Sequence, residues 1–320
     1  MSLIDDIAEK IQAINRLNKP AELDNACLLC DELLEKYGLN REKRHLEGHD
    51  LFIVLNFLNV CTSVYLNKND FQKAWQPVML FELYATNQSA SVDVWGVHYL
   101  LKGLLQERQG DLEKAIETLG NGMKLPCSPS VKQRIAYALG AAETSISSNN
   151  CKINTLCEAL ALAEVNGDER QIAMVYRQMS RMFSYLAYGA IGLSVLHKAE
   201  QYFKNNRDEI ELMSTYMYLA LSYSMMTNTP KYIQLFDEET LKLFQREAER
   251  YVKMIDVDKF LMESDKAYYY RTYGLVYKDI GSIEKALKYY QEIGANKDVQ
   301  DCEGYIQWIK MTATNSFPQT

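Results

Sequence analysis

Apolar residues recur three and four positions apart along most of the chain, which is the spacing of one face of an α-helix. The segment from Ala21 to Tyr37 shows this pattern clearly, through Leu23, Leu28, Leu33 and Leu34. The chain of 320 residues contains only 15 Gly and 6 Pro. That is too few for a many-stranded sandwich or barrel, which needs a turn about every eight to twelve residues. The sequence therefore predicts an all-α protein.

A two-helix pattern is clearest between Ala267 and Ile293, which reads AYYYRTYGLVYKDIGSIEKALKYYQEI. Gly274 and Ala286 are small enough to let the two helices approach closely, and Gly281 is expected to supply the turn between them. The large residues at fixed offsets around these positions are Tyr270, Tyr277 and Tyr290. The segment resembles a tetratricopeptide repeat. In that family the first helix carries a large residue, a small residue and a tyrosine, and the second carries an alanine followed by an aromatic residue four positions later.

More degenerate copies of this pattern occur earlier in the chain. One copy has Gly103, Gly110, Ala115 and Leu119 in the matching positions. Another has Thr62, Asn69 and Ala74, where asparagine suits the turn because it tolerates left-handed backbone geometry. The small residues of successive first helices are Thr62, Gly103, Gly140, Ser180 and Ala220, in steps of about 40 residues. The longer step from Ala220 to Gly274 predicts a helical insertion near residues 228–262.

The resemblance implies a right-handed, tetratricopeptide-like α-solenoid or superhelix of about six degenerate helix pairs with terminal capping helices. We predict a single repeat domain over residues 1–320. Its parts are N-terminal capping helices at 1–39, repeats at 40–295, and a C-terminal capping helix and tail at 296–320. Terminal helices of this kind cover the open ends of a solenoid.

Charge and cysteine content limit the classes of partner. The chain has 35 Lys and Arg against 42 Asp and Glu, a formal net charge of -7, which opposes attraction to nucleic acids or anionic membranes. The first fifteen residues are charged and amphipathic and do not have the pattern of a secretory signal. Seven cysteines, an odd number, fit reduced thiols in a cytoplasmic protein. We therefore expect a cytoplasmic protein that binds neither nucleic acid nor membrane.

Few residues are candidates for catalysis or metal binding. His45, Glu47 and His49 are spaced for one helix face, but a zinc protease needs glutamate directly after the first histidine, where Leu46 stands. Cys27 and Cys30 have no second pair at the spacing of a zinc site, and we expect them in the core. No nucleophile elbow, kinase motif set or dinucleotide fingerprint is present. We predict a protein without catalytic residues, metal or cofactor.

Binding to a partner remains as the expected activity. In tetratricopeptide arrays the first helices of the pairs line a concave surface that contacts an extended peptide or a partner helix. Asparagine can donate to and accept from a peptide backbone at once, and arginine can bind a carboxylate. The residues that fall on this stripe, and that we predict to contact the ligand, are Asn56, Asn59, Ser63, Asn67, Arg134, Tyr137, Arg177, Gln178, Arg181, Tyr268 and Arg271.

The chemistry of the ligand is partly constrained. Leu100 and Leu104 occupy positions where the family's clamp for chaperone tails needs polar residues, so we expect a partly hydrophobic ligand instead. Thirteen methionines gather mainly in the middle repeats, where they serve either adaptable packing or an adaptable binding surface.

We predict a non-enzymatic scaffold that binds a protein or short peptide in the concave groove. The long repeats resemble those of cytosolic peptide-sensing regulators of the Rap and arbitrium-receptor type, which implies a peptide-responsive regulator. No basic helix-turn-helix is readable near the N-terminus, so DNA binding is not expected. The alternative is a constitutive adaptor or assembly subunit of a multiprotein complex, and a remote one is a metal-dependent hydrolase that uses His45, Glu47 and His49. A second copy of the chain, in a homodimer, is a further candidate partner.

Overall fold

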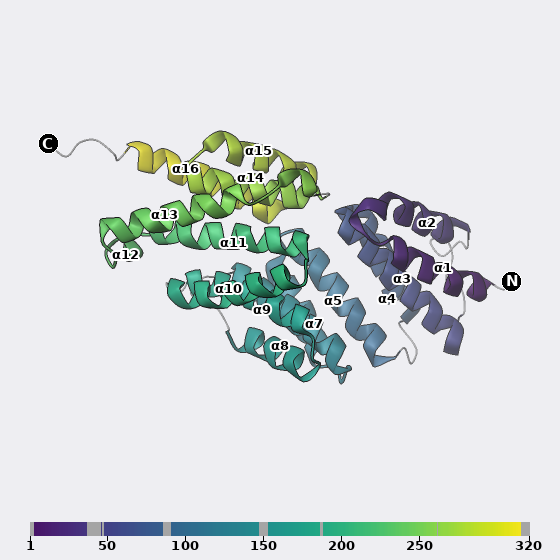
Figure 1. Cartoon of the computed structure of the whole chain (residues 1–320). Coiled ribbons are helices and arrows are strands. Elements are labelled where there is room, and N and C mark those ends of the chain that lie inside the picture. The colour runs from purple at the N-terminus through teal and green to yellow at the C-terminus, as the bar shows by residue number, and fades with distance from the viewer. Residues whose placement is uncertain are drawn as a thin grey trace. The chain divides into compact units, whose positions relative to one another are not determined.

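A computed structural model describes residues 3–36, 46, 48–85, 91–146, 153–185, 188–260 and 262–314. Every regular element in these residues is a helix, which confirms the predicted all-α class (Figure 1). The chain divides into two compact units, Met1–Ala142 and Glu143–Thr320. The single domain predicted over residues 1–320 stays a prediction, and each unit is described by itself.

The first unit contains α1 (Leu3–Leu17), the 3₁₀ helix η1 (Pro20–Glu22), α2 (Leu23–Lys36), α3 (Gly48–Lys68), α4 (Phe71–Ala85), α5 (Val92–Arg108), α6 (Leu112–Met123) and most of α7 (Pro129–Ile146). Helices α3 and α4 pack as one pair and α5 and α6 as the next. The first pair turns at Asn69, whose φ of 60° is left-handed, and the second at Gly110, whose φ is 88°. In each turn the next residue is an aspartate, whose backbone N–H donates a hydrogen bond to a carbonyl oxygen in the last turns of the first helix. In the first pair, the Asp70 N–H donates to Tyr65 O at 2.9 Å. The left-handed turn predicted at Asn69 is confirmed.

Helices α5 and α6 of the first unit can pack closely because Gly103 has no side chain. A Cβ added to Gly103 on α5 would lie 2.5 Å from Leu119 Cγ on α6, closer than real atoms approach. The small residue predicted there is therefore required by packing.

Helix α3 forms much of the core of this unit. Among the described residues it is the one helix long and apolar enough to cross a membrane by length and composition. However, 61% of its apolar window is buried inside the protein, as in the core helix of a soluble fold.

The second unit begins in the last turn of α7 and continues through α8 (Ile153–Val165), α9 (Glu169–Tyr185), α10 (Gly189–Asn205), α11 (Glu209–Asn228), α12 (Pro230–Ile233), α13 (Glu238–Lys253), η2 (Val257–Lys259), α14 (Glu263–Tyr277), α15 (Ile280–Glu292) and α16 (Asn296–Thr314). The pairs are α9 with α10, α11 with α13, and α14 with α15. Helix α13 is therefore the second helix of its pair, and the long step between Ala220 and Gly274 arises from α12 and η2 on either side of it.

The turn between α14 and α15 differs from the prediction. Gly281 was expected to supply it, but Gly281 lies in the first turn of α15. The left-handed residue is Lys278, with a φ of 54°, and Asp279 caps α15 by accepting a hydrogen bond from the Gly281 N–H at 3.1 Å. The close contact predicted at Gly274 is present, because an added Cβ would lie 2.4 Å from Ile283 Cγ1.

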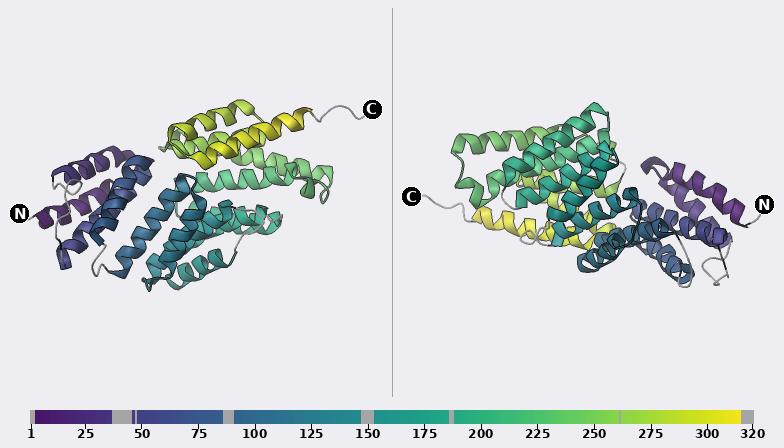
Figure 2. Two further views of the ribbon diagram at one scale, coloured as in Figure 1. Left: turned by 180° about the vertical axis from the view of Figure 1, so that it is seen from behind. Right: turned by 90° about the horizontal axis from the view of Figure 1, so that it is seen from below.

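Helix α16 ends the described chain by packing on α15 (Figure 2). Its Cys302 and Ile309 are buried in a cluster with Ile283 and Ala286 of α15. One face of α16 therefore lies against the last helix pair, and its role as a capping helix stays a prediction.

Candidate functional site

A cavity of about 580 Å³ lies within the second unit. Four long helices line it: α9, α11 and α14, which are the first helices of their pairs, and α16; Pro230 of the short helix α12 adds to the wall. Its wall contains two arginines, four aromatic residues, apolar side chains and several hydroxyls and amides, among them Arg181, Tyr218, Leu221, Met225, Asn228, Tyr268, Arg271, Leu275, Gln300, Tyr305 and Trp308. This mixture of apolar surface with a few polar groups is typical of ligand sites.

Arg271 on α14 is held in place from two sides. Its Nη1 donates to Asp298 Oδ1 of α16 at 2.7 Å, and the side chain is 12% exposed. The guanidinium carbon lies 4.6 Å from the ring centroid of Tyr268 and 5.5 Å from that of Tyr290. These contacts restrict the rotamers of Arg271, so little of its side-chain entropy is left to lose on binding.

Arg181 reaches the same cavity from α9. Its Nη1 lies 3.4 Å from Ser145 Oγ. Burial, and then the neighbouring Tyr218, raise the pKa of Tyr268 well above its usual value, while the charges of Arg271 and Arg181 act in the opposite direction. Because its pKa is raised, the Tyr268 phenol stays protonated and can donate a hydrogen bond.

Aromatic rings connect these arginines to the adjacent helix. The rings of Tyr218 on α11 and Tyr268 on α14 are 5.6 Å apart, inclined at 50°. The guanidinium carbon of Arg177 lies 5.5 Å from the ring centroid of Tyr218. Cation–π and aromatic contacts thus run from α9 through α11 to α14.

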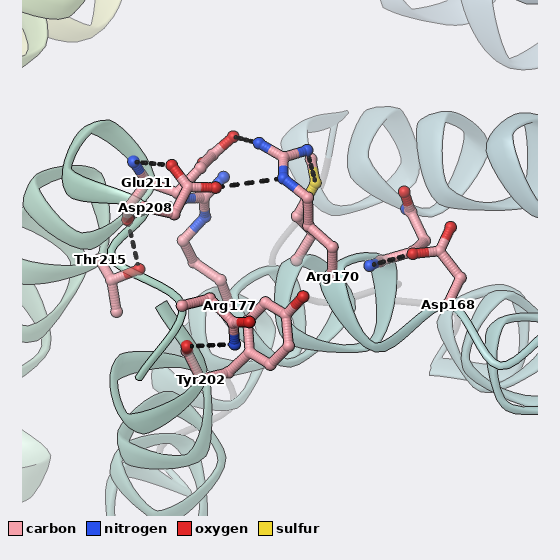
Figure 3. Close-up of polar contacts among 10 residues, drawn as sticks. Asp168, Arg170, Arg177, Tyr202, Asp208, Glu211 and Thr215 are labelled. Carbon is pink, nitrogen blue, oxygen red and sulfur yellow. Dashed lines mark hydrogen bonds and ion pairs between the residues drawn. The ribbon is translucent and has the colours of Figure 1, made fainter. Parts of the chain in front are cut away.

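Arg177 itself belongs to a charged network inside the protein. Figure 3 shows Arg170 and Arg177 of α9 directed toward Asp208 and Glu211 at the start of α11. Arg177 Nη1 lies 2.6 Å from Glu211 Oε2, and Arg170 Nη2 lies 2.8 Å from Glu211 Oε1. Arg170 Nε also lies 3.2 Å from Asp208 Oδ2. This network joins two helices that line the cavity.

No protein-family model and no curated protein matches the sequence. Several solved structures resemble it, among them two complexes. A Rap protein complexed with competence and sporulation factor has a TM-score of 0.56 and 12% identity, over 97% of this chain and 89% of that chain. NprR in complex with its cognate peptide NprX has a TM-score of 0.52 and 13% identity, over 99% of this chain and 85% of that chain. The chain has the helical-repeat fold of these proteins, which confirms the predicted resemblance at the level of the fold.

Three of the predicted contact residues line the cavity: Arg181, Tyr268 and Arg271. Arg177 and Gln178 lie on the same α9 helix but are buried. The side-chain nitrogen of Gln178 is among the few buried polar atoms of the described residues that have no hydrogen-bond partner. The structure thus brings Arg181, Tyr268 and Arg271 together around one cavity, whereas Arg177 and Gln178 lie outside its wall.

The predicted contact residues Asn56, Asn59, Ser63 and Asn67 lie in the first unit, where three of them form hydrogen bonds with other residues of the protein. Asn59 Nδ2 donates to Val94 O at 3.1 Å in the core, and Asn67 Nδ2 donates to Asn18 Oδ1 at 2.9 Å. Asn18 also donates to Ser63 Oγ at 3.4 Å. Asn56 on the same helix is half-buried. These residues stay predicted contacts, but three of them already have partners in the fold.

Arg134 and Tyr137 lie on α7 in the first unit. Arg134 is exposed and Tyr137 is half-buried. Neither lines the cavity of the second unit.

Several cavity residues were missed in the sequence. Tyr305 and Trp308 lie three positions apart on α16, and were assigned only to the closing helix. Tyr218 and Asn228 also lie on α11, two positions before and eight positions after the small residue Ala220. The one available signal was the aromatic spacing on α16, which could have indicated that this helix has a second functional face.

Only some of the candidates for metal chemistry lie within the described residues. His49 is exposed, and His45 and Glu47 lie outside the described residues. Cys30 is buried and Cys27 is half-buried, both as free thiols. Among the described residues no three His, Cys, Asp or Glu side chains come together as metal ligands would.

Proposed function

We propose that this protein is a non-enzymatic, cytoplasmic scaffold that binds a short peptide, or a short segment of a protein partner, in the cavity of its second unit. The observation that carries the proposal is the cavity of about 580 Å³ between α9, α11, α14 and α16. It combines guanidinium groups with aromatic and apolar walls on rigid helices.

The size of the cavity supports a short ligand. Pockets of about 300–1,000 Å³ enclose ligands of drug size, which corresponds to a few amino-acid residues. Helical repeats commonly bind peptides on the surface formed by their first helices. Three of the four helices around the cavity are first helices of their pairs.

The two structural neighbours agree with this proposal. One of them, NprR, was solved with its cognate peptide, and the other, a Rap protein, with competence and sporulation factor. A regulatory role, in which the bound peptide changes the hold on another protein, is the finer form of the proposal. A constitutive adaptor would use the same cavity for a permanent partner segment.

Gly304 offers a direct test, because it lines the cavity and an added Cβ would meet no atom within 4 Å. Gly304→Phe should place a ring at the cavity without disturbing the helix packing. Gly120→Phe is the matched control: Gly120 is also in a helix with open space at its Cβ, but lies on α6 of the first unit.

The measurement is affinity selection of a displayed random heptapeptide library on wild type and both variants. We expect wild type and Gly120→Phe to enrich the same peptides, and folded Gly304→Phe to enrich none of them. Enrichment of the same peptides by all three proteins would contradict a ligand site in this cavity.

A further inference from the structure

We propose that the cavity of the second unit recognises a carboxylate carried next to a large apolar side chain on a short peptide. This proposal rests on the proposed function and specifies its ligand. It is drawn from the charged and apolar side chains that line the cavity.

Positive charge enters the cavity from two different helices. Arg181 of α9 and Arg271 of α14 both line it, and the guanidinium carbon of Arg271 lies 4.6 Å from the ring centroid of Tyr268. A guanidinium has five N–H donors in a planar fork, so it can bind a carboxylate bidentately and still keep a bond to a protein group. Arg181 can therefore retain its contact with Ser145 Oγ while it binds a ligand.

The acidic residues at the cavity have cationic partners within the protein. Asp298 accepts from Arg271 at 2.7 Å. Asp301, which lines the cavity, forms an ion pair with Lys297 one turn earlier on α16. Two guanidinium groups, Arg181 and Arg271, line the cavity against one carboxylate, Asp301, so an anionic group on a ligand complements the wall.

The remaining wall defines the second part of the ligand. Leu221, Met225, Leu275 and Trp308 provide apolar surface next to the charged groups. An apolar side chain placed there would leave water, and a carboxylate on the same or the adjacent residue would reach the arginines. Arg271 is already oriented by Asp298 and Tyr268, so the site is largely formed before the ligand arrives.

Two sources can supply such a carboxylate: the free C-terminus of a peptide, or an aspartate or glutamate side chain. Four matched pools of random pentapeptides that end in Leu or Phe distinguish them, each labelled with an uncharged dye at the N-terminus. One pool has free C-termini and no acidic residue, and a second is the same pool amidated. The third and fourth are amidated and carry glutamate or glutamine before the last residue.

The proteins are wild type, Arg181→Met, Arg181→Lys, Gly304→Phe and Arg246→Met, and binding is measured by fluorescence polarisation. Arg246 is exposed on α13 and is outside the cavity wall, so Arg246→Met controls for the loss of one positive charge in the same unit. Arg181→Lys keeps the charge but not the fork, and provides a second variant in case Arg181→Met alters the fold.

We expect the free-carboxylate pool to bind wild type about tenfold or more tightly than its amidated form. Arg181→Met should remove this difference, Arg181→Lys should reduce it, and Arg246→Met should leave it unchanged. If instead the glutamate pool exceeds the glutamine pool, the carboxylate comes from a side chain and the proposal holds in that form.

Binding that is lost in Gly304→Phe but does not depend on any carboxylate or on Arg181 would overturn this inference and leave the proposed function standing. Absence of any binding sensitive to Gly304→Phe would overturn both. The two failures are therefore distinguishable in the same set of measurements.

Discussion

The Arg177 guanidinium of α9 lies 2.6 Å from the Glu211 carboxylate of α11, and the two side chains are only 10% and 19% exposed. The pair connects residues 34 positions apart and joins two helices that line the cavity. Arg177 also contacts the face of Tyr218, a cavity residue, at 5.5 Å. The pair thus stabilises the contact between two helices of the cavity wall.

Loss of one partner from this pair should destabilise the second unit. Arg177→Met leaves the Glu211 charge with only the outer Arg170, and breaking a buried pair costs about 3–5 kcal/mol. We expect Arg177→Met to lower the free energy of unfolding by an amount near the lower end of this range, measured by urea unfolding followed by circular dichroism. The control Arg170→Met removes a half-exposed partner and should cost less than about 1 kcal/mol. Equal losses in both variants would show that burial of Arg177 has no special role.

The turn between α14 and α15 leads to a second prediction, about thermal stability. Lys278 has a φ of 54°, a conformation that costs a residue with a side chain about 1 kcal/mol relative to glycine. Lys278→Gly should therefore raise the melting temperature. Gly281→Ala should not lower it, because Gly281 is in the helix and its added Cβ would meet only Asp279 Oδ1, at 3.5 Å. A strong destabilisation by Gly281→Ala would contradict this prediction and indicate that the turn depends on Gly281.

Stability of the first unit should fall as the pH is lowered. His98 is buried, with its ring stacked 4.0 Å from Phe81 and its Nε2 3.4 Å from Glu82 Oε1. Burial lowers the pKa of His98 below its usual 6.5, so the folded state binds fewer protons there than the unfolded state. This contribution is complete above pH 6.5 and is lost as the pH falls below that value.

Glu82 extends the same trend to lower pH. The hydrogen bond from His98, helped by Lys102 and opposed by burial, lowers the pKa of Glu82 from 4.5 to about 2. The stability that this carboxylate contributes is present above pH 4.5 and is lost as the pH falls toward 2. In thermal unfolding, His98→Phe should weaken the pH dependence between pH 7 and 5 and retain the stacking on Phe81. An unchanged pH profile would contradict a neutral buried His98.

Trp308 provides a signal for occupation of the cavity. The chain has three tryptophans, and Trp75 and Trp95 are in the first unit. A peptide selected by wild type should reduce the quenching of tryptophan fluorescence by acrylamide, because it shields Trp308. Trp308→Phe should remove that change. A change that persists in this variant would place the bound peptide near the other two tryptophans.

The sequence by itself determined the repeat. Gly103, Gly274 and Asn69 could be recognised because local sterics allow few residue types at a close helix contact or a left-handed turn. Such constraints act within about one helix pair, so they leave a periodic trace along the chain. The same periodicity predicted which helices line a binding surface, and three of the predicted residues, Arg181, Tyr268 and Arg271, line the cavity.

The tertiary structure decided which polar residues are available for a ligand. Asn59 and Arg177 fall on the predicted stripe, but their partners Val94 and Glu211 are 35 and 34 positions away in sequence. Trp308 enters the cavity because α16 lies across the last helix pair, and no repeat motif marks it. A hydrogen bond or cavity wall between distant segments depends on how helices pack in three dimensions, and helical periodicity describes only one helix at a time.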